Sequence, residues 1–393
     1  MVDWNHDVSK DQTGHSHALS GTGLACQGSP QIAMRRLGSV HIPVTLVVST
    51  EASGIDRYAQ EMAKRLPVST ISTGRYKSIQ QTIWLAKQFA FLKQPVHLPN
   101  QHFGRWVPWL SCPSIVTVHD LVRLAFPFAK EGWISAMGLA LDRAGIRKAA
   151  HVICVSEATK RDLMCHLDVP EGKITIVLHG VDHEVFNPCP NQDSSRSRSP
   201  YLLYVGSERP RKNLGTLLRA FALVKQQGHP FNSLTLLKVG PAGRSDAFRK
   251  ATLDEAGRLG IERDIQFVEY VSDQELAVLY SNALALVFPS LYEGFGLPIV
   301  EAMACGCPVI TSNVSSMPEI AGSAALLVNP HDTPALAEAM RCVILDPTQR
   351  ARLRAQGLLR AQDFSWDKTA EATLALYQRV FGRLETQVTS SHG

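Results

Sequence analysis

The amino-acid sequence predicts an α/β fold with two doubly wound domains, each built on a parallel sheet that helices cover. Short apolar segments alternate with amphipathic ones along most of the chain, a pattern typical of strands joined by helical crossovers. This alternation stops at residues 186–200 and then starts again, and the length of 393 residues suits two domains. We expect a cleft between the domains, with ligands at the carboxyl ends of the strands.

The first domain is expected over residues 41–185, after a polar, glycine-rich segment without periodicity that predicts a disordered tail over residues 1–40. Its expected strands are Val44–Ser49, Val96–Leu98, Ile115–Val118, His151–Val155 and Ile174–Leu178. Its expected helices are Asp56–Leu66, Gln80–Phe91, Ala136–Ala149 and Glu157–Leu167.

The second domain is expected over residues 201–364, after a linker at 186–200 that is dense in Pro, Ser and Asn. Its expected strands are Tyr201–Val205, Ser233–Val239, Ile265–Val268, Ala283–Phe288, Pro308–Thr311 and Ala325–Val328. Its expected helices are Leu214–Gln226, Ala247–Leu259, Asp273–Ser281, Pro298–Ala304, Pro334–Leu345 and Thr348–Asp363. A last amphipathic segment, Trp366–Arg383, lies in residues 365–386.

The composition excludes several classes of protein. A net charge of +5 is too small and too dispersed to predict a nucleic-acid partner, although it suits phosphates or an acidic membrane surface. We find no apolar stretch long enough for a membrane span or a signal peptide. The eight cysteines form no pair of CxxC units, which predicts neither a zinc site nor a disulfide framework and fits a reducing cytoplasm. Cys305 and Cys307 are expected to be small packed residues.

The segment from Ala283 to Thr311 carries the strongest chemical signal. A strand is followed by a loop that holds Glu293, and Pro298 then opens a short helix that contains Glu301 and ends at Gly306. A helix N-terminus beside the end of a strand favours an anion, and carboxylates can accept bonds from vicinal sugar hydroxyls. The alternative is a surface loop with two solvated acids.

Two cations follow the first strand of the second domain. Gly206 and Ser207 turn the chain there, and Arg211 and Lys212 precede a helix whose expected cap is Asn213. Paired cations at this edge of the sheet could clamp a phosphate. A solvated basic turn remains the alternative, and no Walker motif is present.

Two features of the first domain would face the same cleft. His119 ends an apolar strand, where it could contact a sugar hydroxyl or serve only a structural role. Gly54 opens the first helix, where it could admit a ligand or simply form a turn. The string GxGxxG is missing, so a dinucleotide fingerprint is absent.

These segments together resemble glycosyltransferase family 4, a group of retaining enzymes with the GT-B fold. EGFGLPIVE matches the family's E-x7-E signature, and YVGSERPRKNL matches the start of its nucleotide-binding domain. VTVHDL, CVSEATKRDL and HGVDHEVFNP resemble stretches of the acceptor-binding domain and its exit. FSWDKTAEATLALY is similar to the family's terminal segment, which implies that residues 365–386 pack back on the N-terminal domain.

The resemblance implies a role for each matching residue. Arg211 and Lys212 would stabilise the leaving diphosphate, Glu293 would hold hydroxyls of the transferred sugar, and His119 would lie near the reacting carbon. Gly54 would lie near the donor phosphates and the acceptor. Ser207 departs from family members that carry arginine after the glycine, which leaves this phosphate contact open. The implied donor-binding residues are Gly206, Ser207, Val271, Gly294, Phe295, Gly296, Leu297 and Glu301.

The implied reaction is transfer of a hexose from a nucleotide sugar to a hydroxyl of a glycan or lipid-linked glycan. No Asp-x-Asp string occurs, so we expect no metal cofactor. GDP-mannose is the expected donor, because HDLVRLAFP and PRKNL resemble mannosyltransferases of polysaccharide assembly; UDP-glucose transfer and nucleotide-sugar epimerisation are alternatives. The absent GxGxxG argues against a nicotinamide-dependent oxidoreductase, and the acids and cations argue against an inactive sugar-binding protein. The protein is expected in the cytoplasm, and Trp106 and Trp109 raise the alternative of peripheral membrane contact.

Overall fold

The computed structural model describes residues 43–49, 54–73, 85, 87–126, 133–189, 199–243 and 245–390. Residues 41–393 form one compact unit that holds two sheets, each of six strands. All neighbouring strands of both sheets run parallel. The α/β fold with two doubly wound domains is therefore confirmed, whereas the expected tail at residues 1–40 lies outside the described residues.

The N-terminal sheet has the strand order β2-β1-β3-β4-β5-β6. Its strands are β1 (Thr45–Ser49), β2 (Ser69–Thr73), β3 (Val96–Leu98), β4 (Ser114–Val118), β5 (His151–Cys154) and β6 (Ile174–Ile176). The connecting helices are α2 (Gly54–Arg65), η1 (Gln101–Trp109), α4 (Val122–Ala125), α5 (Trp133–Lys148), α6 (Glu157–Leu167) and η2 (Glu171–Lys173).

The C-terminal sheet has the order β12-β11-β10-β7-β8-β9. Its strands are β7 (Tyr201–Val205), β8 (Thr235–Val239), β9 (Ile265–Val268), β10 (Ala285–Phe288), β11 (Val309–Ser312) and β12 (Ala325–Val328). Its α-helices are α7 (Leu214–Lys225), α8 (Asp246–Leu259), α9 (Asp273–Asn282), α10 (Leu297–Ala304), α11 (Met317–Ala321), α12 (Thr333–Leu345) and α13 (Pro347–Ala361). Short 3-10 turns are η3 (Pro210–Lys212), η4 (Phe231–Ser233) and η5 (Glu262–Asp264).

Each sheet has one topological switch point, a pair of neighbouring strands from which the chain order runs outward on both sides. This switch point positions the site. In the C-terminal sheet β7 and β10 are neighbours, so their following loops diverge and leave a crevice between them. In the N-terminal sheet the same happens between β1 and β3. The sequence motifs with Arg211 and Glu293 follow β7 and β10, and the motif with His119 follows β4.

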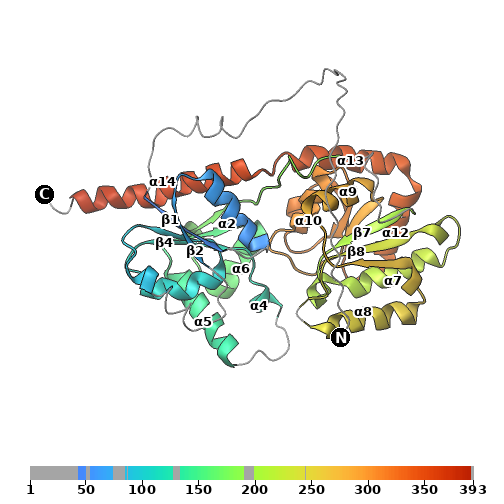
Figure 1. Ribbon diagram of the computed structural model, residues 1–393, viewed down its shortest axis with the longest axis horizontal. Coiled ribbons are helices and arrows are strands. Elements are labelled where there is room, and N and C mark those ends of the chain that lie inside the picture. Colours follow the sequence, from blue (N-terminus) through green and yellow to red (C-terminus); the bar gives the residue numbers. More distant parts are fainter. Residues whose placement is uncertain are drawn as a thin grey trace, which may run out of the picture. The chain divides into compact units, whose positions relative to one another are not determined.

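The terminal helix α14 (Trp366–Ser390) lies against α2 of the N-terminal domain, as the red and blue helices of Figure 1 show. Tyr377 of this helix shares a hydrogen bond with the buried His97 on β3. At the start of the crossing, a side chain on Gly180 would place its Cβ 2.1 Å from the backbone nitrogen of Trp366. Only glycine allows the chain to pass so closely there.

The expected strands are all found, with ends that agree to within two residues. One strand was missed: β2 has the sequence STIST, and its largely exposed polar residues give no apolar run. Of the expected helix Gln80–Phe91, residues 80–84 and 86 lie outside the described residues, and residues 85 and 87–90 are helical. Phe186, the first residue of the expected linker, is buried in the core of the C-terminal domain.

Candidate active site

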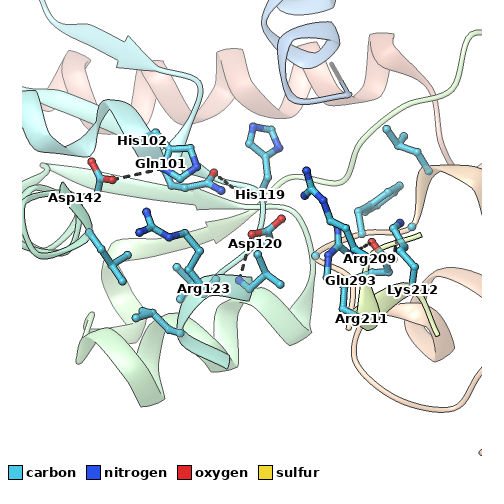
Figure 2. A pocket seen from close by; sticks show the side chains of 18 of the residues that line it. Gln101, His102, His119, Asp120, Arg123, Asp142, Arg209, Arg211, Lys212 and Glu293 are labelled. Atoms are coloured by element: carbon cyan, nitrogen blue, oxygen red, sulfur yellow. Dashed lines mark hydrogen bonds and ion pairs between the residues drawn. The ribbon is translucent and has the colours of Figure 1, made fainter. Parts of the chain in front are cut away.

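A cavity of about 780 Å³ opens at the carboxyl ends of the strands and is lined by residues from both domains. Figure 2 shows Arg211, Lys212 and Glu293 at one end, His102 and Asp142 at the other, and His119 between them. Eight of the residues singled out from the sequence line this cavity: His119, Arg211, Lys212, Glu293, Gly294, Phe295, Gly296 and Leu297. Four others, whose surroundings the structure describes, do not line it: Gly206, Ser207, Val271 and Glu301.

The loop after β10 leads into the short helix α10, and glycines define both ends of that helix. Gly296 occupies the N-cap position of α10 with φ at 109°, a backbone conformation that side-chain-bearing residues rarely adopt. At the other end, the N–H of Gly306 donates to Met303 and that of Cys307 donates to Ala302, which closes the helix with a Schellman motif. The predicted start at Pro298 and stop at Gly306 are therefore confirmed to within one residue.

The cationic turn after β7 is joined directly to this acidic loop. The backbone N–H of Leu291 donates to the carbonyl of Arg211 at 2.7 Å. Arg211 also donates through Nη1 to the carbonyl of Tyr292 at 2.9 Å. Asn213 occupies the expected N-cap position of α7, but its side chain makes no capping hydrogen bond, and its amide donates to the carbonyls of Pro289 and Pro330 instead. The side chain of Asn213 thus ties the turn to the ends of neighbouring segments.

Glu293 lies between both cations. Its carboxylate is 2.9 Å from Arg211 Nη1 and 2.6 Å from Lys212 Nζ. Burial by itself would raise the pKa of Glu293, but Lys212 and Arg211 outweigh burial and hold that pKa below its usual value. Burial lowers the pKa of Lys212, and the attraction of Glu293 opposes this only in part. The cluster therefore holds an ionised glutamate and carries a net positive charge when Lys212 is protonated.

The lining as a whole favours an anionic ligand. Its cations are Arg123, Arg143, Arg209, Arg211 and Lys212, and its acids are Asp120, Asp142 and Glu293. Arg105 binds Asp142 from outside the lining through Nε at 2.9 Å and Nη2 at 2.8 Å, which compensates that carboxylate further. An excess of cations in a cleft attracts and concentrates anions such as a diphosphate.

His119 is buried and both of its ring nitrogens have partners. Nε2 lies 2.7 Å from the carbonyl oxygen of Pro99, which can only accept, so Nε2 carries the proton. Nδ1 therefore accepts from Nε2 of His179 at 3.0 Å, and the two rings stack. Burial lowers the pKa of His119 to about 4, so the ring is neutral near pH 7.

Glu301 lies away from the cavity, on the buried face of α10. Tyr280 donates to its carboxylate at 3.1 Å. Burial raises the pKa of Glu301 to about 7, while the charge of Arg57 and the bond from Tyr280 oppose the shift. The spacing of eight residues suggested that Glu293 and Glu301 share one cleft, whereas only Glu293 lines the described cavity.

Gly294 has a different reason to be glycine than the sequence suggested. We expected it to let a ligand approach the backbone. In the structure, a Cβ at Gly294 would lie 1.7 Å from the carbonyl oxygen of His119. The residue therefore permits two loops from different domains to touch through their backbones.

The remaining donor-side residues from the sequence have mostly structural contacts. The N–H of Gly206 donates to Val239, and the carbonyl of Ser207 accepts from Tyr204. Val271 packs against the core of the C-terminal domain. Gly54 is the first residue of α2, and residues 50–53 before it lie outside the described part.

Sequence reasoning assigned no role to three arginines of the lining, Arg123, Arg143 and Arg209. Arg209 belongs to the RPRK string and could have been found there. Arg123 and Arg143 lie on helices whose sequence gives no sign of the cavity. In the described part of the chain, no group of three or more His, Cys, Asp or Glu side chains is arranged to hold a metal ion.

Comparison with known proteins identifies the family. The model named Glycosyltransferase Family 4 matches residues 44–185, and the model named Glycosyl transferases group 1 matches residues 190–360. O-antigen chain mannosyltransferase B of Escherichia coli is 38% identical over 272 residues, which cover 67% of this chain and 70% of that protein. The chain belongs to glycosyltransferase family 4. It is an enzyme of the hexosyltransferase class.

Solved structures show that this family 4 chain has the GT-B fold. Sucrose-phosphate synthase from Thermosynechococcus elongatus superposes with a TM-score of 0.71 at 24% identity, over 87% of this chain and 100% of that one. Anabaena HepE in complex with UDP and glucose gives a TM-score of 0.71 at 17% identity, over 86% and 99% of the two chains. Among the helices of the described residues, none has the length and apolar character of a membrane span.

Proposed function

We propose that this family 4 enzyme is a retaining mannosyltransferase that takes mannose from GDP-mannose and builds a polysaccharide or glycolipid. The observation that carries the proposal is the cluster of Arg211, Lys212 and Glu293 in a cavity at the switch point of the C-terminal sheet. Mannose as the sugar is supported by the 38% identity to the Escherichia coli mannosyltransferase. The role of each residue below belongs to the proposal.

The two cations would bind the diphosphate of the donor. During transfer, the bond from the anomeric carbon to the phosphate oxygen breaks, and negative charge grows on the leaving group. Arg211 and Lys212, which now pair with Glu293, would lie where that charge develops, and fixed cations in a buried site lower the barrier most effectively there. The same cations now contact Glu293, so a bound diphosphate would compete with this carboxylate for them.

Glu293 would accept hydrogen bonds from hydroxyls of the transferred sugar, with the backbone of Gly294, Phe295 and Gly296 beside it. The acceptor oxygen would form its bond on the face from which the diphosphate leaves. Its proton would pass to the departing phosphate oxygen, which balances the reaction without a protein base. His119 would remain neutral beside the sugar, because its pKa of about 4 keeps it unprotonated at neutral pH.

Glu301 would hold the ribose of the donor, and Gly206, Ser207, Val271 and Leu297 would complete the donor site. Of these residues only Leu297 lines the described cavity. Gly54 would approach the donor phosphates from the N-terminal domain, where it begins α2. Arg209 extends the cationic side of the lining and would support the same phosphates.

A donor screen tests the proposal directly. The purified protein is mixed with GDP-mannose, GDP-glucose, UDP-glucose and UDP, and its melting temperature is measured with each. A ligand that binds the folded state raises the melting temperature, and at a hundred times its Kd the gain is about 2.7 kcal/mol. We expect the largest rise with GDP-mannose. A rise with UDP-glucose alone would reject the mannose donor and favour glucosyl transfer, for which HepE in complex with UDP and glucose gives a structural precedent.

Radiolabelled donor separates transfer from epimerisation. A transferase releases label into a larger product only when an acceptor is present, whereas an epimerase changes the sugar without any acceptor. Conversion without acceptor to another nucleotide sugar would reject the proposed transfer. The anomeric configuration of the product, measured by NMR, tests retention.

We also propose that the N-terminal domain contacts an anionic lipid surface that carries the acceptor. Phe91 is 82% exposed and Trp109 is 61% exposed. Ser111 donates to the carbonyl of Leu92, which brings their two segments together, and Lys148 donates to the carbonyl of Pro108 at 3.0 Å. Exposed aromatic rings beside cations suit a membrane interface. The native protein should sediment with anionic liposomes at low salt, whereas a Trp109→Ala variant should stay in solution. If the native protein does not bind the liposomes, this membrane contact is rejected.

A further inference from the structure

We propose that Tyr292 is a positioning residue whose hydroxyl holds the Glu293 loop of the C-terminal domain against the His119 strand end of the N-terminal domain. The inference deepens the proposed function, because it rests on the roles proposed above for Glu293 and His119. It concerns a residue that the E-x7-E signature does not include, since Tyr292 precedes the first glutamate.

The hydroxyl of Tyr292 bridges two separate segments of the N-terminal domain. It donates to Oδ2 of Asp162, on α6, at 2.6 Å. It also accepts from the backbone N–H of Leu121 at 3.2 Å. Leu121 lies two residues after His119, and Glu293 follows Tyr292 directly in the chain. One hydroxyl thus links both proposed catalytic segments.

This hydroxyl is well suited to a fixed bridge. Tyr292 is only 9% exposed, so water competes little for its bonds. Burial and then the bond to Asp162 raise the pKa of Tyr292 far above its usual value, so the proton stays on the hydroxyl. A hydrogen bond to a carboxylate is stronger than one between neutral groups.

Backbone contacts next to Tyr292 require the same alignment. The carbonyl of Gly294 accepts from Oγ of Ser156 at 2.6 Å and from Oγ1 of Thr159 at 3.3 Å. Both donors lie at the start of α6, the helix that also carries Asp162. The missing side chain of Gly294 leaves room for the carbonyl oxygen of His119. These contacts hold the loop of residues 292–294 against α6 and residues 119–121 of the N-terminal domain, a contact region that we call the seam. The hydroxyl of Tyr292 bonds to Asp162 and Leu121 in addition, and so fixes the orientation of the loop at the seam.

A third contact holds α6 at the same seam. The carboxylate of Glu319, on α11 of the C-terminal domain, accepts from the backbone N–H of Glu157 at 2.9 and 3.0 Å. A carboxylate at a helix N-terminus is favoured by the free N–H groups and the helix dipole. Because α6 is held at its first turn by Glu319, Asp162 is presented to Tyr292 from a fixed element.

Four single variants test the positioning role. Tyr292→Phe removes the hydroxyl and keeps the ring, and Asp162→Ala removes its acceptor. Asp162→Asn keeps an oxygen that can accept and should rescue most of the function. Tyr201→Phe is the matched control, since its buried hydroxyl donates to the carbonyl of Leu279 within the C-terminal domain and lies away from the seam.

Steady-state transfer kinetics with the donor found by the screen give the first readout. We expect Tyr292→Phe and Asp162→Ala to lower kcat at least about tenfold, because misplacement by a fraction of an ångström already slows a positioned reaction. The Kd for the nucleotide alone should change less than twofold, and Asp162→Asn and Tyr201→Phe should keep kcat near the native value. An unchanged kcat in Tyr292→Phe, or an equal loss in Tyr201→Phe, would overturn the proposal.

Amide hydrogen exchange of the same proteins tests the seam without any substrate. The N–H groups of Leu121 and Glu157, which bond across the seam, should exchange faster in Tyr292→Phe than in the native protein, while Tyr201→Phe should match the native rates. If no nucleotide sugar supports transfer, the proposed function fails, but hydrogen exchange still decides whether Tyr292 holds the two segments together. Equal exchange rates in Tyr292→Phe and native protein would overturn the positioning role.

Discussion

Replacing Gly294 by alanine tests whether contact between the two domains is needed for catalysis. The added Cβ would lie 1.7 Å from the carbonyl oxygen of His119, whereas ordinary van der Waals contact begins at 3.4 Å. The two backbones must therefore separate by about 1.7 Å, the difference between these distances. A misplacement of about 1 Å at a catalytic site costs on the order of a hundredfold in rate. We expect Gly294→Ala to lower kcat by at least about a hundredfold.

The assay compares kcat, nucleotide Kd and thermal stability of Gly294→Ala with those of a matched glycine variant. Gly215→Ala is suitable, because its Cβ meets only Arg219 Nη1, at 3.5 Å, and the residue lies in α7 outside the seam. That variant should transfer sugar at the native rate and be at least as stable, since alanine favours a helix over glycine by about 1 kcal/mol. In Gly294→Ala, each domain should still fold and the nucleotide should still bind.

Two results would refute the reasoning. Transfer by Gly294→Ala at a rate near that of the native protein would show that the seam need not close for the reaction. A loss of nucleotide affinity equal to the loss of kcat would show that Gly294 serves the donor directly, as first expected from the sequence.

Three further predictions follow from the charges of the site. Arg211→Ala or Lys212→Ala should each cut transfer at least about a hundredfold, because one lost group at a developing charge costs ~3–4 kcal/mol; near-native activity of both would remove them from the mechanism. Transfer should persist in EDTA, and loss of activity that a divalent metal restores would contradict this expectation. The pKa of Glu301 rises from 4.5 to about 7 on folding, so its contribution to stability is complete below pH 4.5 and falls by about 3 kcal/mol as the pH rises through 7. The free energy of unfolding, measured in urea at several pH values, should show this fall in native protein and not in Glu301→Gln. The same dependence of this free energy on pH in both proteins would disprove the raised pKa.

The sequence predicted the secondary structure because most strands and helices carry a clear periodicity. The strands from Tyr201–Val205 to Ala325–Val328 are short apolar runs, and the structure has each of them. Polar β2 was missed for the same reason, since an edge strand with exposed residues has no apolar signature. Pro298 and Gly306 marked the ends of α10 because their backbone preferences act locally.

The residues that bear charge could also be named from the sequence. Arg211, Lys212 and Glu293 stood out because they follow apolar strands, and parallel strands bring their carboxyl ends to one edge. Their mutual contact was not readable, because it depends on β7 and β10 being neighbours across a long stretch of chain. The same limit applies to Glu301, because its spacing from Glu293 does not show that its carboxylate is buried, bonded to Tyr280 and outside the lining of the described cavity.

What the sequence determined by itself is therefore the set of elements, the family signature and the charged residues, since each depends on neighbours along the chain. Only the tertiary structure decided what lies across the seam. Gly294 touches His119, and Tyr292 bonds to Asp162 and Leu121, although these partners are more than a hundred residues apart. The physical reason is that side-chain and backbone complementarity between two domains depends on distances of a few ångströms, and no periodicity in the chain encodes those distances.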